Sequence, residues 1–525
     1  MATPCLEAPI SVTAERESAL NAAERLTQRA SLNIIASLLD YFAKMAVGLL
    51  LTPILVAGLG RALFGVWEML GRLVGYMSVT DGRPTEALRL IVANRQALDD
   101  SALKRRYVGS AVVVWMLFLP VLATGGIILV WLSPAIAKVA PESYATVRLT
   151  AALLVINFLL ATLVALPESV LRGMNLGYKR MGLQAGLSML GGLITAEAIH
   201  LGSGLVGVAL AQVVLTCMAG ILFWYVVQKY VAWFGISRPT RADLRRLLGL
   251  STWNTVGTLV TKVHLASDVI ILGVIASASM VTTYVLTGYA AQAVTGIVTL
   301  AFGAVTPGLA GLIGCKQYDK TAVLRKEMMA MNWLLVTAIG STILLWNRSF
   351  LHLWVGEKYY AGSWANLLIV LIMAQTTFIR SDAYVIDATL KLRDRVLVSA
   401  MAALFSVALS ILLTPSLGII GLCLGLLLGR LVQTVSYPFI VNSCLGKPQQ
   451  LSLSWIVRPG LAMVLCFAGS GYLGERFIAR NWIEWLGCVA ASFALVLCIG
   501  FAAGLPIDSR ESVIRRFKQM RFSVR

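Results

Sequence analysis

The chain has 525 residues, of which 58% are hydrophobic and only 13% are charged. A soluble protein carries roughly 25% charged residues, so this composition excludes a soluble globular protein and predicts a polytopic membrane protein. The net charge of +19 lies in short segments between apolar runs, so it does not indicate nucleic-acid binding.

The predicted elements begin with a polar segment, Met1–Arg29, which lacks the apolar core of a signal peptide. We expect a cytoplasmic tail there, either disordered or folded as a short amphipathic helix. Apolar runs of about 18 residues or more then predict fourteen spanning helices and an all-α fold. They lie near 32–56, 63–82, 108–132, 149–168, 181–201, 204–227, 249–274, 282–312, 330–347, 364–388, 396–414, 418–441, 455–474 and 483–505. The run 282–312 is longer than one span needs, and Pro307 suggests a kink within it.

Basic residues gather in alternate connecting segments. If the N-terminus is cytoplasmic, the inner segments hold the basic clusters at 83–106, 172–180, 229–246, 316–326, 391–395 and 515–525. The outer loops hold few cations, so the positive-inside rule places both termini in the cytoplasm. The longest inner segments, 83–107 and 229–247, are expected to form surface helices with basic faces. No loop is long enough to hold a soluble catalytic domain.

An internal repeat relates the two halves of the chain. The stretch 170–180 resembles 384–394, and 201–207 resembles 416–421 at nearly the same shift. Helices one to six and seven to twelve therefore look like two pseudo-symmetric six-helix lobes in parallel orientation. The expected organisation is a tail (1–29), an N-lobe (30–228), an inter-lobe loop (229–247), a C-lobe (248–445), two extra helices (446–507) and a basic tail (508–525).

Charged residues lie inside the spans that open the first copy. Asp40 and Lys44 are four residues apart, as are Glu68 and Arg72, so each pair shares a helix face. A cation at bilayer depth costs roughly 2.5–3.5 kcal/mol on insertion scales, and it normally faces protein or a water-filled cavity. We therefore expect Lys44 and Arg72 to face the interior near the membrane midplane.

The second copy carries a comparable set. Lys262 lies near the middle of its span, and His264 stands four residues before Asp268, where the two can pair. His264 is expected to bond Asp268 or, as an alternative, to carry protons. Arg380 lies toward the cytoplasmic end of its helix. Arg430 follows a stripe of glycines at every fourth position, 421 to 429, which indicates close helix packing.

These charges allow two interpretations. Acidic residues could neutralise the cations in an ion-pair network that only joins helices. Alternatively, the cations line a cavity for an anion such as a phosphate or diphosphate, whose usual partners are Arg and Lys. We assign substrate binding to Lys44, Arg72, Lys262 and Arg380, and ion pairing or coupling to Asp40, Glu68, His264 and Asp268. The scattered cysteines and histidines suggest no metal site, and no cofactor is expected.

Several segments carry a family resemblance. The stretch 52–60 (Thr-Pro-Ile-Leu-Val-Ala-Gly-Leu-Gly), the stretch 64–67 (Phe-Gly-Val-Trp), the loop 201–207 and its second copy resemble the polysaccharide (O-antigen, Wzx-like) flippase family. This family belongs to the superfamily of multidrug (MATE) exporters and lipid II flippases. The likeness covers roughly 32–505. The chain departs from the family where Asp81-Gly82-Arg83-Pro84 replaces the common Asp-Leu-Gly-Leu.

The resemblance implies a function. Such a protein moves a polyprenyl-diphosphate-linked oligosaccharide across a bacterial inner membrane for polysaccharide biosynthesis, without catalysing a reaction. It implies a central cleft between two lobes and alternating access by rocking of one lobe against the other. The implied partners are the lipid-linked glycan, the bilayer and other polysaccharide-assembly proteins.

Three alternatives remain. A drug or cation exporter of the same fold would need an acid-rich cavity, whereas this one is predicted to be basic. A membrane-bound polymerase or ligase would need catalytic residues on sizeable outer loops, and the outer loops here are short. A scaffold without transport activity would not need cations at the midplane.

Overall fold

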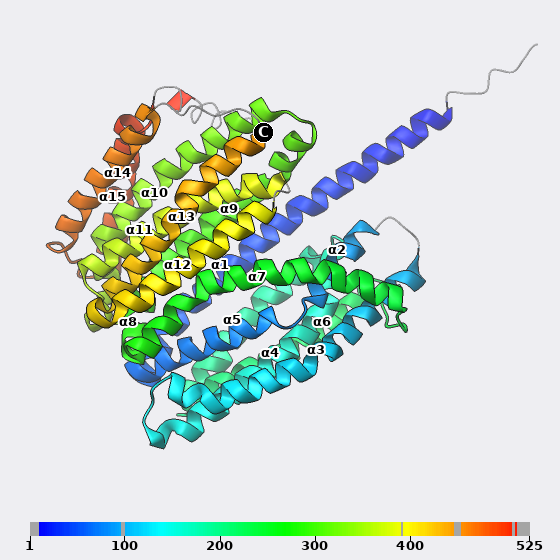
Figure 1. Ribbon diagram of the computed structural model, residues 1–525, viewed down its shortest axis with the longest axis horizontal. Coiled ribbons are helices and arrows are strands. Elements are labelled where there is room, and N and C mark those ends of the chain that lie inside the picture. Colours follow the sequence, from blue (N-terminus) through cyan, green and yellow to red (C-terminus); the bar gives the residue numbers. More distant parts are fainter. Residues whose placement is uncertain (1–9, 96–99, 390–391, 446–452, 507–509, 512–525) are drawn as a thin grey trace, which may run out of the picture. The chain divides into compact units, whose positions relative to one another are not determined.

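The structure is a computed structural model that describes residues 10–95, 100–389, 392–445, 453–506 and 510–511 (Figure 1). Within these residues all regular secondary structure is helical, which confirms the predicted all-α fold. The α-helices are α1 (Ile10–Tyr76), α2 (Pro84–Asn94), α3 (Ser101–Ile136), α4 (Tyr144–Gly173), α5 (Tyr178–His200), α6 (Gly204–Tyr230), α7 (Arg241–Ile275), α8 (Ala278–Thr287), α9 (Tyr289–Gly314), α10 (Tyr318–Trp354), α11 (Ser363–Ala388), α12 (Leu392–Leu417), α13 (Ile419–Leu445), α14 (Leu453–Gly474) and α15 (Trp482–Ile499).

Every predicted span falls on a helix. Eleven stretches among the described residues are long and apolar enough to cross a membrane, and the protein is therefore a multi-pass membrane protein. One of these stretches, 38–79, contains two predicted spans, and α5 and α7 carry two more. Among the described residues of α7, Ala266–Ile275 is a shorter apolar segment.

The first two spans are two helices joined directly at a kink. The label α1 covers both helices, and the backbone departs from helical geometry between them at Gly60, where φ is 75° and ψ is 172°. At this positive φ a Cβ atom would clash with the backbone of its own and the adjacent residues, so glycine is the residue that permits the kink. The run 282–312 is also interrupted by a glycine. It breaks between α8 and α9 at Gly288, and α9 then continues as one helix to Gly314, so the kink suggested at Pro307 remains a prediction.

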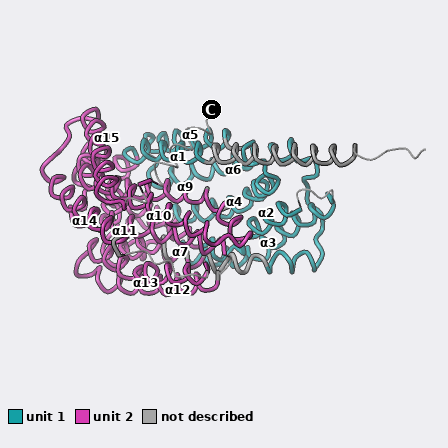
Figure 2. The backbone as a smooth tube through the Cα atoms, turned by 90° about the horizontal axis from the view of Figure 1, so that it is seen from above, with its two compact units in different colours: residues 1–54, 77–130, 149–255 teal, residues 55–76, 131–148, 256–525 magenta. Residues whose placement is uncertain are grey.

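The chain forms two compact units (Figure 2). Unit 1 contains residues 1–54, 77–130 and 149–255, and unit 2 contains 55–76, 131–148 and 256–525. The C-terminal third of α1, residues 55–76, therefore belongs to unit 2, while residues 10–54 belong to unit 1. The lobes predicted at 30–228 and 248–445 remain a prediction.

Unit 1 has a core of mainly aliphatic side chains, with the aromatic Tyr107, from α2, α3, α4, α6 and the start of α7. The segment Asp81–Pro84 directs the chain into α2, the surface helix expected within 83–107. Gly82 and Arg83 both have positive φ, and the Asp81 carboxylate accepts a hydrogen bond from the backbone N–H of Arg83 at 2.9 Å. Pro84 is then the first residue of α2, where its missing N–H costs nothing. The departure from the family pattern thus builds a tight turn.

Unit 2 is built around α10, α11 and α13, with α14 and α15 packed on α10. The glycine stripe of α13 brings this helix close to α12, and the two run side by side in Figure 1. A Cβ on Gly425 or Gly429 would overlap the backbone of Ser410 or Ser406 on α12. The stripe therefore sets the helix spacing, as the sequence predicted.

Replacing Gly429 by alanine should destabilise the protein, because the new methyl group has no room against Ser406. Overpacking of this kind costs about 1–3 kcal/mol, which a lower midpoint of thermal unfolding in detergent would reveal. Gly471→Ala in α14 is the matched control, since no atom lies within 4 Å of a Cβ there. A Gly429→Ala protein that is as stable as the control would contradict this prediction.

Candidate functional site

The first predicted pair lies in unit 1. Lys44 Nζ is 2.9 Å from Asp40 Oδ2, and the two side chains are 55% and 21% exposed. The pair therefore forms as the four-residue spacing predicted. Its ammonium group remains accessible within unit 1, where a ligand could reach it.

The remaining predicted cations lie in unit 2, and two of them share one helix interface. The C-terminal third of α1 packs on α7, where the hydroxyl groups of Tyr76 and Ser267 are hydrogen-bonded at 2.7 Å. A Cβ on Gly75 would lie 3.6 Å from Lys262 Nζ, so the ammonium group reaches α1 beside this glycine. Arg72 is one turn earlier on α1 and interacts electrostatically with Tyr76 and Glu68. Arg72 and Lys262 thus converge on the α1–α7 interface.

Asp268 connects this interface to α8. Its Oδ2 accepts a hydrogen bond from the Tyr284 hydroxyl at 2.9 Å, and its Oδ1 accepts one from the Val269 N–H at 2.8 Å. Glu68 interacts electrostatically with Asp268. The expected partner of Asp268 was His264, whose side chain lies outside the described part of the structure. Tyr284 was not assigned to the site, because nothing in the sequence spacing relates it to Asp268.

Arg430 extends the cluster to α13. Its guanidinium group donates a hydrogen bond to Thr376 Oγ1 on α11 at 2.9 Å, and it interacts electrostatically with Asp268, Tyr284 and Arg380. The sequence assigned Arg430 to helix packing because of the glycines before it. The glycines do pack α13 on α12, but the arginine side chain contributes to the charged cluster. Its position inside an apolar span was the available signal.

These residues form one charged cluster in unit 2. The cluster consists of Glu68, Arg72, Lys262, Asp268, Tyr284, Arg380 and Arg430. Four of them are basic and two are acidic, so the cluster has an excess of positive charge. Such an arrangement can bind an anion, since guanidinium and ammonium groups are the usual partners of phosphate oxygens. Lys44 belongs to unit 1, and its proximity to this cluster remains a prediction.

A second set of contacts joins the part of α1 that follows the kink to α8. Arg61 Nη2 donates a hydrogen bond to Thr283 Oγ1 at 2.5 Å, and Thr282 Oγ1 donates one to the Arg61 carbonyl at 2.6 Å. A Cβ on Gly65 would overlap the Ala278 carbonyl, so α1 touches α8 here without an intervening side chain. Arg61 was expected in an outer loop. These contacts hold the kinked part of α1 against α8.

Two other acidic residues have partners that the sequence did not predict. Asp382 pairs with Arg325 of α10, with an Nε–Oδ1 distance of 2.8 Å. Arg325 was expected in an inner loop and is buried instead, because α10 starts at Tyr318 and carries it into the protein. Asp387 forms an ion pair with Arg395 of α12 and also interacts electrostatically with Arg380, seven residues earlier on α11.

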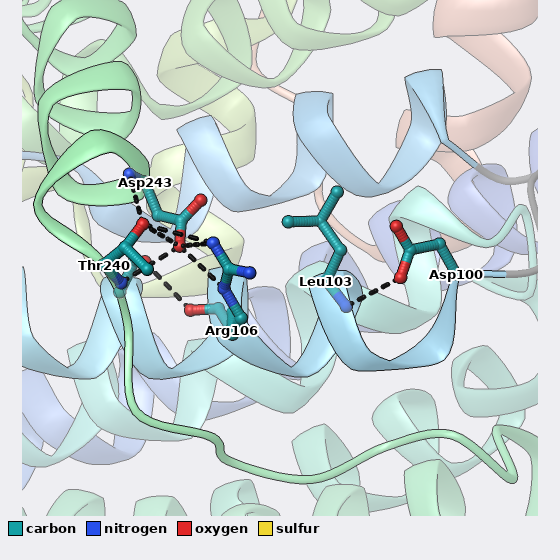
Figure 3. Close-up of polar contacts among 6 residues, drawn as sticks. Asp100, Leu103, Arg106, Thr240 and Asp243 are labelled. Atoms are coloured by element: carbon teal, nitrogen blue, oxygen red, sulfur yellow. Dashed lines mark hydrogen bonds and ion pairs between the residues drawn. The ribbon is translucent and has the colours of Figure 1, made fainter.

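At the start of α7, a polar contact fixes the inter-lobe segment to α3 (Figure 3). Arg106 donates two hydrogen bonds to Asp243 Oδ2, at 2.9 and 2.7 Å. Thr240 and Asp243 also form a reciprocal cap, in which each side chain accepts the other residue's N–H. Burial raises the pKa of Asp243, but the bonds from Thr240 and Arg106 outweigh this effect and keep the pKa below its ordinary value of 3.8.

Replacing Asp243 by asparagine should destabilise unit 1 by about 1–3 kcal/mol at pH 7, since a charged hydrogen-bond acceptor is lost. A carboxylate with a lowered pKa stabilises the folded state above its ordinary pKa, and this contribution disappears as the pH falls through the lowered value. The difference in unfolding midpoint between the two proteins should therefore shrink only below pH 3.8. Glu86→Gln, which breaks an exposed pair with Arg89, is the control and should change little. A constant difference down to the lowest pH would contradict this assignment.

Comparisons with known proteins show which family and which solved structures this chain resembles. Residues 31–312, more than half of the chain, match the family described as polysaccharide biosynthesis protein. The chain belongs to this family. A comparison with curated protein sequences finds no significant match.

Among solved structures, the fold of this polysaccharide biosynthesis protein is similar to that of two transporters. The lipid II flippase MurJ in an inward closed conformation has a TM-score of 0.63 and 11% identity, with 89% of this chain and 99% of that chain covered. An inward-facing multidrug resistance MATE family transporter of the MOP superfamily has a TM-score of 0.62 and 12% identity, with 81% and 100% covered. These similarities show the fold that the sequence resemblance implied.

Proposed function

We propose that this protein is a flippase that translocates a polyprenyl-diphosphate-linked oligosaccharide across a bacterial inner membrane. Membership of the polysaccharide biosynthesis family supports a role in glycan assembly. The fold similarity to a lipid II flippase supports transport of a lipid-linked glycan. The observation that carries the proposal is the charged cluster of unit 2, in which Arg72 and Lys262 converge on one helix interface with an excess of positive charge.

In this proposal, Arg72 and Lys262 bind the diphosphate or acidic sugars, and Arg380 and Lys44 add positive charge along the path. A diphosphate carries several negative oxygens, so it can bond more than one cation at once. Glu68 and Asp40 neutralise the cations while no substrate is bound, which lowers the cost of charges within the membrane. The apolar lipid remains in the bilayer, where its burial costs nothing.

Rocking of two lobes would expose the site to each side of the membrane in turn. Both termini are cytoplasmic in this proposal, as the distribution of basic residues indicates. The protein does not catalyse a reaction on the glycan, and it works beside other polysaccharide-assembly proteins that make and use the lipid-linked intermediate. A cation exporter is disfavoured, because the basic cluster would repel its substrate.

Reconstitution tests the proposal directly. Liposomes containing the purified protein and a fluorescent polyprenyl-diphosphate-linked oligosaccharide are treated with an impermeant quencher that reaches only the outer leaflet. We expect the protein to make the inner-leaflet lipid accessible faster than in protein-free liposomes. The same lipid with a neutral headgroup should move more slowly, because a neutral headgroup offers no negative charge that the cationic cluster can bind. Equal rates with and without protein, or efflux of an organic cation instead, would overturn the proposal.

A further inference from the structure

A cavity of about 250 Å³ lies in unit 2 between α10 and α15. On α10 its lining residues recur at helical spacing from Ile339 to Phe350, and on α15 they are Trp485, Val489 and Phe493, each four residues after the last. Both sets therefore form a stripe along one helix face. At a rise of about 1.5 Å per residue, the stripe is about 16 Å long on α10 and about 12 Å long on α15. This cavity, the α10–α15 slot, is thus long and narrow.

Two hydrogen bonds join the walls of the α10–α15 slot. The indole N–H of Trp346 donates to Ser492 Oγ at 3.0 Å, and that of Trp485 donates to the Trp346 carbonyl at 3.3 Å. Because two indole rings stand between the helices, α15 cannot pack closer to α10. Every residue of α15 is at least partly exposed, including the three that line the slot. The slot is therefore a space that the packing of these two helices leaves open.

The polar side chains that line the α10–α15 slot direct their donors into the protein. The hydroxyl of Thr342 donates to the Ala338 carbonyl at 2.8 Å, and Asn347 Nδ2 donates to the Thr287 carbonyl and to Asn366 Oδ1, at 2.9 and 2.8 Å. Asn347 Oδ1 is buried and accepts no hydrogen bond from the described residues. A buried water needs about two to four polar partners, and a sugar has more hydroxyl groups to satisfy. The walls of the slot therefore suit an apolar group.

We propose that the α10–α15 slot binds one acyl chain of a membrane phospholipid, which completes the packing of α15 on α10. Pockets for drug-sized ligands measure about 300–1,000 Å³, so this cavity holds a single chain and not a whole lipid. Lipid chains surround α15, which is a membrane span with every residue partly exposed. An empty apolar cavity destabilises a protein increasingly with its volume, and a bound chain removes this cost.

The shape of the slot favours a phospholipid chain over the lipid that the proposed flippase carries. A polyprenyl chain has a methyl branch on every isoprene unit, whereas an acyl chain is unbranched and fits a long, narrow space better. The inference goes beyond the proposed flippase function and does not depend on it, because it concerns how unit 2 is completed in the bilayer and not what is transported.

Photolabelling of the full-length protein tests this inference. Liposomes of phosphatidylethanolamine and phosphatidylglycerol contain the protein and a phospholipid with a diazirine on one acyl chain, and mass spectrometry locates the adducts after irradiation. We expect adducts at Ile343 and Phe350, which are 8% and 7% exposed and can be reached only by a chain inside the slot. Val489→Phe, which narrows the slot, should lose these adducts. Leu486→Phe is the matched control, because it adds the same ring at an exposed position of α15, and it should keep them.

A wild-type protein labelled on the exposed residues of α15 but not at Ile343 or Phe350 would overturn the proposal, and so would a Val489→Phe protein labelled like the wild type. If Val489→Phe does not accumulate, Ala290→Leu narrows the slot from α9 and should show the same loss. A parallel reaction uses a polyprenyl-diphosphate-linked oligosaccharide with the diazirine on its lipid chain. Stronger labelling of Ile343 and Phe350 by this probe would assign the slot to the carried lipid and refute the phospholipid. The flippase proposal stands or falls separately, on the quenching experiment.

Discussion

Replacing Arg72 or Lys262 by alanine should reduce flipping of the diphosphate-linked glycan by about 10–100-fold while leaving the amount of protein in the membrane near normal. A charge-assisted contact contributes about 1.5–3 kcal/mol, and a change of 1.36 kcal/mol is tenfold in rate or affinity. Both side chains are only half-buried, so their removal leaves no large cavity. The measurements are the initial flipping rate in liposomes and the abundance of each variant by immunoblot.

Conservative variants refine this expectation. Lys262→Arg should keep part of the activity, because the charge remains although its geometry changes. Lys320→Ala is a matched control, since it removes an exposed cation at the start of α10 that is not a member of the charged cluster. A loss of flipping in this control as large as that in Arg72→Ala would mean that overall charge matters and not the cluster.

Substitutions at Lys44 distinguish a role in substrate binding from a purely structural role. Its pair with Asp40 is largely exposed within unit 1, and exposed ion pairs contribute about 0–1 kcal/mol. Lys44→Ala should therefore reduce flipping without lowering abundance. If the pair were only structural, Lys44→Ala with Asp40→Ala would restore both abundance and flipping. Restored flipping in the double variant would contradict the assignment of Lys44 to substrate binding.

The sequence predicted the helical segments well, because apolar runs of sufficient length have one stable form in a bilayer. What it could not predict is how consecutive segments join. Gly60 permits a kink instead of a loop, whereas Gly288 ends a helix within a predicted span. Both positions are glycines in apolar surroundings, and only the contacts of each segment decide between the two outcomes.

The candidate site shows the same limit. Spacing within one helix predicted the Asp40–Lys44 pair, because a four-residue separation determines which side chains face each other. Spacing gives no information on partners from other helices. Asp268 bonds Tyr284 of the next helix, and Asp382 bonds a residue that is 57 positions away. Contacts of this kind depend on how the helices pack, and a single sequence does not contain that geometry.

The pair of Arg325 and Asp382 should have the largest effect on stability of any ion pair in the described residues. Their side chains are only 3% and 4% exposed, and the Nε–Oδ1 distance is 2.8 Å. Replacing either residue alone by a neutral one, as in Arg325→Met or Asp382→Leu, leaves the other charge buried without its partner. The unpaired charge lowers the free energy of unfolding by about 3–5 kcal/mol. Each single variant should therefore be scarce in the membrane and unfold at a much lower temperature.

The double variant Arg325→Met with Asp382→Leu should recover most of this loss, because two apolar side chains of similar volume are often as stable as a buried ion pair. Arg348→Ala is the control, since its pair with Glu357 is more exposed and should contribute at most about 1 kcal/mol. Thermal unfolding in detergent gives the double-mutant cycle for the pair. Independent, additive losses in the two single variants would show that the residues are not coupled. A stable double variant that no longer flips the glycan would instead place the pair in the transport cycle, because α10 and α11 would then need these charges to move and not to fold.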